Sequence, residues 1–308
     1  MRRHPAALAL PGLVSVLCLL AATAPPAPSF AAPAATAVSA AAGTVRLSSY
    51  NICGNMCSGP PYDRERRIAA VVAEADPSGG WGADQLYLQE VCEHQYEELL
   101  DRLGPSGYSG VHSATLPAGN PAICEGHAYG NAVIVRGPLS GTAELDLTVG
   151  GEREPITVPC ALALLADRPT WSCSVHLYWD DGTLAVPEAD RLAEQAGRWL
   201  AEGFSVVLGG DFNHSPRTDT LSRFYLPERG DGAFGSFLEA DETDREFFDA
   251  AGCPPAASAC RSGEPTFGAK KLDYVFLDSP GFRTADADAL PLDPAVSDHD
   301  LVRVTATG

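Results

Sequence analysis

The chain has 308 residues, and its 21 Lys and Arg side chains face 40 Asp and Glu side chains, so the formal net charge is −19. A hydrophobic fraction of 45% and a charged fraction of 20% are ordinary globular usage and exclude a wholly disordered chain, a collagen and a coiled coil. The acidity argues against a protein that coats nucleic acid by bulk charge, but it allows an enzyme that contacts a few phosphates through a metal ion.

The first 31 residues have the pattern of a secretory signal peptide. Two arginines open the segment, no acid occurs in it, and an apolar stretch covers residues 6–24. Ser29 and Ala31 place small side chains at the two positions that a signal peptidase recognises. We therefore expect residues 1–31 to be cleaved and the protein to be secreted into the extracellular space.

A membrane anchor is the competing interpretation of this segment. Pro11 and Gly12 interrupt the apolar stretch, which falls short of the roughly 20 apolar residues that a spanning helix needs. We expect no stable membrane anchor. Residues 32–43, mostly Ala, Pro and Ser, are expected to be a disordered tail, and residues 44–308 to form one folded domain.

The cysteines indicate disulfides. Removal of Cys18 with the signal peptide leaves an even number, which in an exported protein favours disulfide bonds. Zinc is disfavoured because no C-x2-C pair occurs and the histidines do not cluster with the cysteines. Cys160 and Cys173 flank a predicted turn, and Cys253 and Cys260 close a short loop, so we predict these two pairs. The sequence leaves four others without assigned partners: Cys53, Cys57, Cys92 and Cys124.

Apolar periodicity predicts strands and helices that alternate along the chain. Asp63 is expected to cap the first helix, and Gly104-Pro105 to end the second. Residues 105–128 are expected to be a loop. The predicted strands cover residues 45–52, 85–91, 131–135, 156–165, 171–177, 204–208, 273–277 and 301–304. The first predicted helix begins at Asp63, and the other two cover residues 93–103 and 187–202. This alternation predicts a mixed α/β domain, with sheets in the middle and helices outside.

Polar side chains recur where these strands begin or end. Taken singly, each has an ordinary explanation as a turn residue, a helix cap, a solvated strand start or a sheet histidine. Their order and joint spacing carry the functional argument, because α/β proteins build their sites at strand ends that face a shared cleft. The residues are Asn51, Glu90, His176, Asp211, Asn213, Asp273, Asp298 and His299.

In that order the motifs resemble the endonuclease/exonuclease/phosphatase superfamily. Gly210-Asp211-Phe212-Asn213 and Ser297-Asp298-His299 are the most specific, and the resemblance covers essentially the whole of residues 44–308. The other matching pieces are Ser49-Tyr50-Asn51-Ile52, Leu88-Gln89-Glu90, Gly130-Asn131-Ala132, Val175-His176-Leu177, Thr266-Phe267 and Leu272-Asp273-Tyr274. The resemblance implies a deoxyribonuclease I-like, four-layer α/β sandwich of two packed mixed β-sheets flanked by helices, and metal-dependent hydrolysis of phosphate esters.

The resemblance also assigns roles to the residues. A divalent cation can neutralise phosphate oxygens, and Mg²⁺ prefers oxygen ligands; Mn²⁺ and Ca²⁺ are alternatives. Metal binding is expected at Glu90, supported by Asn51 and Asp298. The expected catalytic residues are His176, Asp211, Asn213, Asp273 and His299. Asp211 would orient the attacking water with Asn213, and Asp273 would fix the tautomer of His299, but the division of acid and base roles between the two histidines stays open.

The substrate is less constrained. We expect a monomeric, nuclease-type phosphodiesterase whose partner is a phosphate ester, with extracellular nucleic acid as the leading substrate. Alternatives are a sphingomyelinase- or phospholipase C-like esterase, a phosphomonoesterase, and an inactive binding module on the same fold. Residues 105–128 make a poor membrane wedge, which disfavours the lipid esterase. The scarcity of cations argues against strong, salt-dependent tracking of phosphates.

Overall fold

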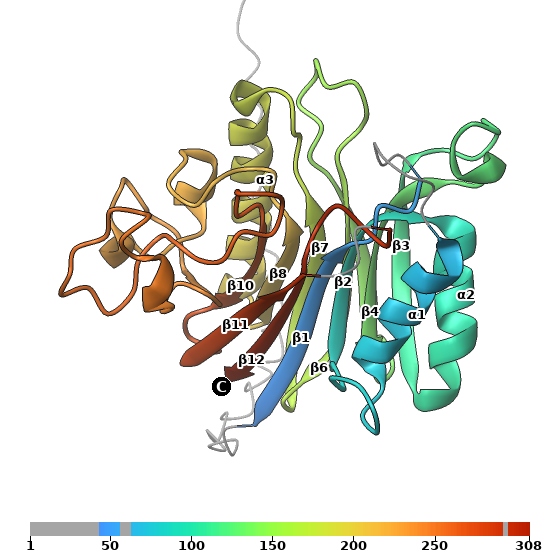
Figure 1. Ribbon diagram of the computed structural model, residues 1–308, viewed down its shortest axis with the longest axis horizontal. Coiled ribbons are helices and arrows are strands. Elements are labelled where there is room, and N and C mark those ends of the chain that lie inside the picture. Colours follow the sequence, from blue (N-terminus) through green and yellow to red (C-terminus); the bar gives the residue numbers. More distant parts are fainter. Residues whose placement is uncertain (1–42, 56–62, 292–294) are drawn as a thin grey trace, which may run out of the picture. The chain divides into compact units, whose positions relative to one another are not determined.

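The computed structural model describes residues 43–55, 63–291 and 295–308 (Figure 1). The predicted signal peptide, and all of the predicted tail except its last residue, lie outside the described residues. Within the described ranges no helix is both long and apolar enough to cross a membrane. The helices are α1 (Arg64–Ala75), α2 (Glu93–Leu103) and α3 (Gly182–Ala201), with short 3-10 turns between other elements.

Two six-stranded mixed sheets form the centre of the domain. The first has the order β11-β12-β1-β2-β4-β3 and the second β5-β6-β7-β8-β10-β9. The strands are β1 (Thr44–Asn51), β2 (Gln85–Cys92), β3 (Tyr108–Leu116), β4 (Tyr129–Arg136), β5 (Gly141–Asp146), β6 (Thr157–Leu165), β7 (Arg168–His176), β8 (Ser205–Asp211), β9 (Phe237–Glu239), β10 (Asp273–Asp278), β11 (Thr284–Leu290) and β12 (Leu301–Thr307).

Three apolar clusters hold four layers together. Helices α1 and α2 lie side by side on the outer face of the first sheet, where Ile68 and Leu99 pack against strand residues such as Leu86 (Figure 1). Helix α3 covers the outer face of the second sheet through a buried stripe that includes Leu192. Side chains such as Val207 fill the space between the two sheets. The predicted four-layer sandwich is confirmed.

Local signals explain where the helices begin. The Asp63 carboxylate accepts a hydrogen bond from the backbone of α1, as predicted, and α2 covers the predicted residues. Helix α3, however, begins at Gly182, five residues before the predicted start at Pro187. Asp181 supplies the cap by accepting from the Thr183 N–H at 2.8 Å, and the proline lies inside the helix. Pro187 is the sixth residue of the helix, where it has no N–H to donate to the carbonyl four residues before it, so α3 lacks one backbone hydrogen bond near its start.

The prediction of a loop over residues 105–128 was wrong in part, because residues 108–116 form β3. This strand pairs antiparallel with β4 along its whole length. Strands β5, β9 and β11 were also missed. These four strands are the four edges of the two sheets. Strands β3, β5 and β11 are partly solvated and carry polar residues, so they lack the apolar runs by which the other eight were recognised, and β9 has only three residues.

Both predicted disulfides are present. Cys160 and Cys173 are directly opposed in the hairpin of β6 and β7, with Cα atoms 4.1 Å apart, and Cys253 is bonded to Cys260. The structure also bonds Cys92 to Cys124, a pair that the sequence left unassigned. This third bond ties the start of α2 to the segment before β4. Cys57 lies outside the described residues.

Candidate active site

The directions of the strands bring the predicted residues to one edge of the sandwich. Strands β1 and β2 are parallel to each other, and so are β7 and β8, so their carboxyl ends carry Asn51, Glu90, His176 and Asp211. Strand β10 is antiparallel to β8, and β12 is antiparallel to β1, so the amino ends of β10 and β12 arrive at the same edge. Asp273 begins β10, and His299 lies two residues before the start of β12.

Asp211 occupies the centre of this group because of strand register. It lies opposite His176 on β7 and opposite Asp273 on β10. The glycine before it is required by close packing, since a Cβ atom at Gly210 would lie 2.0 Å from the carbonyl oxygen of Val175. Position 210 also has φ +150°, in the region that favours glycine.

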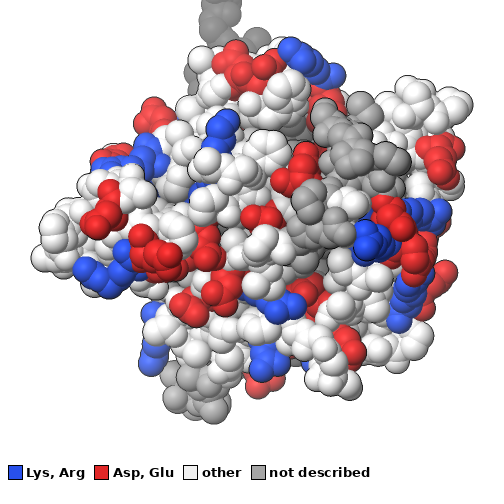
Figure 2. All heavy atoms as spheres, in the orientation of Figure 1, with Lys and Arg blue, Asp and Glu red and all other residues white. Residues whose placement is uncertain are grey.

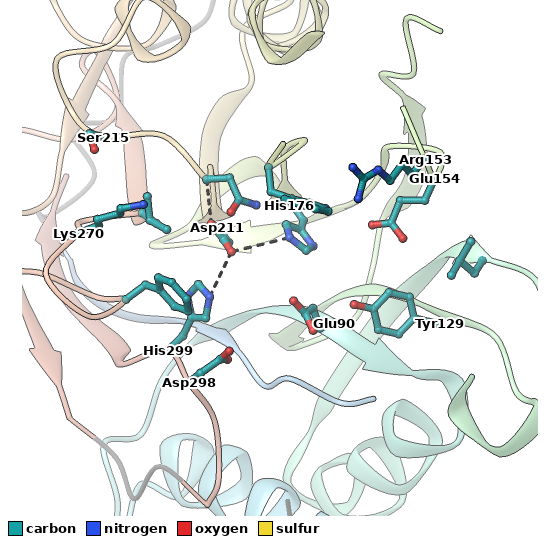
Figure 3. Close-up of a pocket in the computed structure, with 15 residues that line it drawn as sticks. Glu90, Tyr129, Arg153, Glu154, His176, Asp211, Ser215, Lys270, Asp298 and His299 are labelled. Atoms are coloured by element: carbon teal, nitrogen blue, oxygen red, sulfur yellow. Dashed lines mark hydrogen bonds and ion pairs between the residues drawn. The ribbon is translucent and has the colours of Figure 1, made fainter. Parts of the chain in front are cut away.

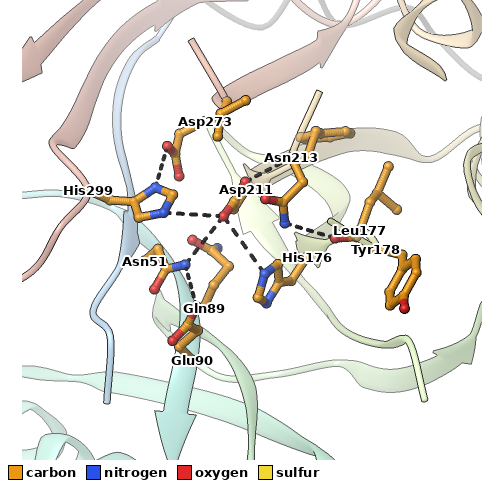
Figure 4. Close-up of polar contacts among 12 residues, drawn as sticks. Asn51, Gln89, Glu90, His176, Leu177, Tyr178, Asp211, Asn213, Asp273 and His299 are labelled. Carbon is orange, nitrogen blue, oxygen red and sulfur yellow. Dashed lines mark hydrogen bonds and ion pairs between the residues drawn. The ribbon is translucent and has the colours of Figure 1, made fainter. Parts of the chain in front are cut away.

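Four groups surround the Asp211 carboxylate (Figure 4). Its Oδ2 lies 3.8 Å from His176 Nε2 and 3.6 Å from His299 Nε2, and it accepts a hydrogen bond from Asn51 Nδ2 at 3.3 Å. Its Oδ1 accepts from the backbone N–H of Asn213 at 2.8 Å. Burial and the nearby negative charge of Asp273 raise the pKa of Asp211, against the lowering effect of the two imidazoles.

His299 is oriented by a buried carboxylate. Its Nδ1 lies 2.8 Å from Asp273 Oδ2, and the Asp273 side chain is completely buried. Burial alone lowers the pKa of His299, but the charges of Asp273 and Asp211 and the hydrogen bond from His299 to Asp273 outweigh it and raise the pKa to about 10. The ring of Phe267 lies against the imidazole at 4.8 Å between centroids. The predicted pairing of Asp273 with His299 is therefore seen in the structure.

Glu90 owes its direction to an irregularity in β2. The pairing of β2 with β4 shifts register between Leu88 and Val91, and Glu90 has φ +59°, in the left-handed region. A bulge of this kind re-aims a side chain. The Glu90 Oε1 atom accepts a hydrogen bond from Asn51 Nδ2 at 3.0 Å, and the Glu90 backbone N–H donates to Asn131 Oδ1 at 3.3 Å.

The three residues predicted to bind a metal ion, Glu90, Asp298 and Asn51, differ in where their side chains point. Glu90 and Asp298 both line the cavity, and burial together with nearby negative charges raises the pKa of Asp298. A cation beside these carboxylates would offset that repulsion, so Glu90 and Asp298 fit a divalent metal. The Asn51 amide nitrogen faces Glu90 and Asp211, while its oxygen accepts from the Cys53 N–H at 3.0 Å. Asn51 thus supports Glu90 through its nitrogen.

A second acidic group also has the spacing of a metal site. Ligand atoms of Asp211, Asp273 and His299 lie within 4.8 Å of one another. Here His299 Nδ1 and Asp273 Oδ2 already share a hydrogen bond, so these two atoms are engaged with each other. This geometry suits proton transfer and orientation better than metal binding.

A cavity of about 620 Å³ opens over these residues (Figure 3). Six of the eight predicted site residues line it: Glu90, His176, Asp211, Asn213, Asp298 and His299. Asn51 and Asp273 are not in the lining; both are fully buried and act on the lining residues through hydrogen bonds. Asn213 is fixed in place by donating from Nδ2 to the Leu177 carbonyl at 2.9 Å.

Several lining residues had no signal in the sequence. Arg153 and Glu154 lie in an irregular segment before β6, and Trp179 and Lys270 lie in short connecting segments. Glu154 is the most relevant to the chemistry. Burial raises its pKa, and a positive charge on His176 acts in the opposite direction, so the two side chains interact. His176 therefore has acidic neighbours in Asp211 and Glu154, neither of which belongs to its own strand.

Comparison with known proteins places this arrangement in a family. A model of the Endonuclease/Exonuclease/phosphatase family matches residues 48–299. A search of curated proteins found no match. The matched range contains every predicted site residue.

Solved structures share the fold at low sequence identity. The human Nocturnin catalytic domain with bound sulfate is 17% identical with a TM-score of 0.61, covering 86% of this chain and 93% of that one. A mannosyl-6-phosphatase from Bacteroides thetaiotaomicron is 15% identical, with a TM-score of 0.59 and coverage of 85% and 99%. Truncated TDP2 from Caenorhabditis elegans is 16% identical, with a TM-score of 0.58 and coverage of 86% and 98%. These likenesses establish the fold.

Proposed function

Because this chain belongs to the endonuclease/exonuclease/phosphatase family of phosphoric ester hydrolases, we propose that it is a secreted, divalent-metal-dependent phosphodiesterase of the nuclease type. Nucleic acid is the proposed substrate. The proposal is supported by the chemistry of the cavity and by the cysteines. The three disulfides between described residues are compatible with an extracellular protein.

The observation that carries the proposal is the pair of imidazoles on one carboxylate. His176 Nε2 and His299 Nε2 lie 3.8 and 3.6 Å from the same Oδ2 atom of Asp211. Hydrolysis of a diester needs one group that accepts a proton from the attacking water and another that gives a proton to the leaving alkoxide. Two imidazoles beside a central carboxylate supply both groups.

Each remaining residue has a role in holding this arrangement. Asp211 orients the attacking water, and Asn213, fixed by Leu177, holds that water or a phosphate oxygen. Asp273 keeps the proton on Nδ1 of His299, which leaves its Nε2 atom for the reaction. The water oxygen forms the new bond to phosphorus, the bond to the leaving oxygen breaks, and the imidazoles of His176 and His299 divide the two proton transfers.

The proposed metal ion is Mg²⁺, with Mn²⁺ or Ca²⁺ as alternatives. Glu90 and Asp298 would hold it, with Asn51 keeping Glu90 in position. A bound divalent cation supplies positive charge that offsets the phosphate oxygens and the developing alkoxide. In a chain of net charge −19 that contribution replaces the surface lysines that many phosphate-binding proteins use.

A substrate panel tests the proposed function. The purified, oxidised protein is incubated with Mg²⁺ and with plasmid DNA, RNA, sphingomyelin vesicles and a set of phosphomonoesters. We expect cleavage of nucleic acid, and its loss on chelation. Release of choline phosphate alone, or of inorganic phosphate from monoesters alone, would contradict the nuclease assignment while leaving the hydrolase family intact. The Asp211→Asn variant, purified in parallel, controls for contaminating nucleases.

A further inference from the structure

Trp179 presents a large aromatic ring at the edge of the catalytic cavity. Its side chain is 52% exposed although it lines the cavity, whereas its neighbour Tyr178 is only 3% exposed. Most tryptophan side chains are largely buried, so an exposed indole at an active site is informative. None of the catalytic steps described above uses this ring.

The backbone just before Trp179 is held by two hydrogen bonds. The Leu177 carbonyl accepts from Asn213 Nδ2 at 2.9 Å, and the Tyr178 N–H donates to the buried Glu188 carboxylate at 3.0 Å. The Tyr178 ring belongs to the apolar cluster under α3. These contacts fix the backbone before Trp179, so a ligand that stacks on the indole need not order the loop first.

A guanidinium lies over the same ring. The Arg153 side chain is 5.2 Å from the indole centroid and forms an ion pair with Asp180 at 2.7 Å. The Asp180 carboxylate neutralises much of the arginine charge, while more than half of the tryptophan side chain stays exposed. The available surface is therefore mainly the exposed part of the indole, which lines the cavity.

The charges around the cavity disfavour a substrate that is bound mainly through phosphates. Arg153, Lys270 and His299, whose pKa is raised to about 10, are the cationic residues of the lining, against four carboxylates: Glu90, Glu154, Asp211 and Asp298. On the face drawn in Figure 2, Lys and Arg side chains lie singly among acidic ones and form no continuous basic strip. Duplex binding without base contacts depends on such a strip, because each phosphate contact comes from a cation.

We propose that Trp179 is a stacking platform for a nucleobase next to the scissile phosphate, and that the enzyme prefers single-stranded nucleic acid. This inference rests on the proposed function. Stacking on an aromatic side chain tolerates any base and is available only where the base has left its neighbours, as in a single strand. In a duplex both faces of each base are already covered, and unstacking has an energetic cost.

The test compares three proteins on matched oligonucleotides. Wild type, Trp179→Ala and Trp179→Phe are assayed on DNA and RNA single strands, on the same sequences as duplexes, and on single strands with one abasic position. We expect wild type to cleave single strands faster than duplexes. Trp179→Ala should lower kcat/KM on single strands by roughly 5- to 150-fold, the range of one base–aromatic stack. Trp179→Phe should retain most of the wild-type kcat/KM.

The abasic substrates identify the interaction. An abasic position next to the cleavage site should lower kcat/KM of the wild type by about the same factor as the Trp179→Ala substitution does on the intact strand. The same abasic position should lower kcat/KM of Trp179→Ala only a little further. Phe234→Ala is the matched control, because Phe234 is 61% exposed and has Arg223 over its ring at 5.6 Å, yet it does not line the cavity. This variant should behave as wild type.

The failures are distinguishable. If wild type cleaves single strands and Trp179→Ala cleaves them equally well, or if duplex is the better substrate, the stacking inference is wrong and the proposed function stands. If wild type cleaves no nucleic acid but hydrolyses sphingomyelin vesicles or phosphomonoesters, both the proposed function and this inference are overturned.

Discussion

His299 Nδ1 lies 2.8 Å from the Oδ2 atom of Asp273, whose side chain is inaccessible to solvent. The contact joins the start of β10 to the residues before β12, so it links the two sheets at the edge where the cavity opens. It fixes which ring nitrogen carries the proton and which one, Nε2, faces Asp211.

We predict that His299→Ala lowers kcat/KM by about 10²–10⁴-fold, the range for loss of an acid–base group, and that it costs more than His176→Ala. Asp273→Asn should give a partial version of the same defect, because the imidazole loses the group that fixes its tautomer. The double variant should be little worse than His299→Ala alone. Measurements of kcat/KM for the single and double variants check this. An Asp273→Asn effect that is absent, or that simply multiplies with that of His299→Ala, would refute the pairing.

Glu90 should dominate metal affinity. Replacement by Gln removes a negative charge but keeps an oxygen that accepts from Asn51 Nδ2. We expect Glu90→Gln to weaken Mg²⁺ or Mn²⁺ binding, measured by calorimetry, by at least about 10-fold, and to lower turnover strongly. Glu97→Gln, on the exposed face of α2, is the control and should bind metal as wild type does. Equal metal affinities in wild type, Glu90→Gln and Glu97→Gln would show that Glu90 is not a metal ligand.

The disulfides should differ in their contribution to stability. The Cys92–Cys124 bond closes a separation of 32 residues and the Cys253–Cys260 bond one of only 7. Loss of the first, as a double Ser variant, should lower the free energy of unfolding by about 2–4 kcal/mol, and loss of the second by less, because the unfolded chain gains more freedom from the longer loop. Denaturant titrations of both variants measure the difference. A larger loss for the short loop would show that local packing outweighs loop length.

Buried Glu188 should make stability depend on pH. Burial raises its pKa from 4.5 to about 7, although the Tyr178 N–H donates to it. Since the folded pKa is the higher one, unfolding releases a proton in this window. The group therefore destabilises the fold increasingly as pH rises from about 4.5 to about 7, and the cost stays constant above that.

Glu188→Gln removes that titration. Relative to wild type, the variant should gain stability between pH 4.5 and pH 7, on the order of 3 kcal/mol, and the difference should level off above pH 7. Urea unfolding at four or five pH values provides the measurement. A difference that is the same at every pH would mean that the carboxyl group does not change its proton binding on unfolding.

The parts of the structure that were predictable are those with strong patterns. The eight inner strands have apolar runs, and Asp63 and Gly104 mark helix ends, so these elements were found from the sequence. The four edge strands were not found, because β3, β5 and β11 are partly solvated and β9 has only three residues. The start of α3 was misplaced because proline is a common first residue of a helix, which favoured Pro187. The actual cap is Asp181.

The candidate site divides in a similar way. Its polar residues at strand ends were recognisable because motifs such as Gly210-Asp211-Phe212-Asn213 are local. Glu154 and Trp179 were not, since only the three-dimensional arrangement brings their segments to the cavity. The orientation of the Glu90 side chain toward the cavity likewise depends on a bulge in β2, which cannot be recognised from the local sequence.

The most direct test of the proposed chemistry is the hydrolysis rate of Asp211→Asn under single-turnover conditions, with Mg²⁺ and a phosphodiester substrate. Asp211 is the group that both imidazoles share, and Asn keeps an acceptor for the Asn213 N–H. We predict a rate about 10²–10⁴-fold below wild type with an unchanged melting curve, while the control Asp286→Asn, at an exposed position of β11, retains the full rate. A folded Asp211→Asn variant that hydrolyses the diester as fast as wild type would contradict the account.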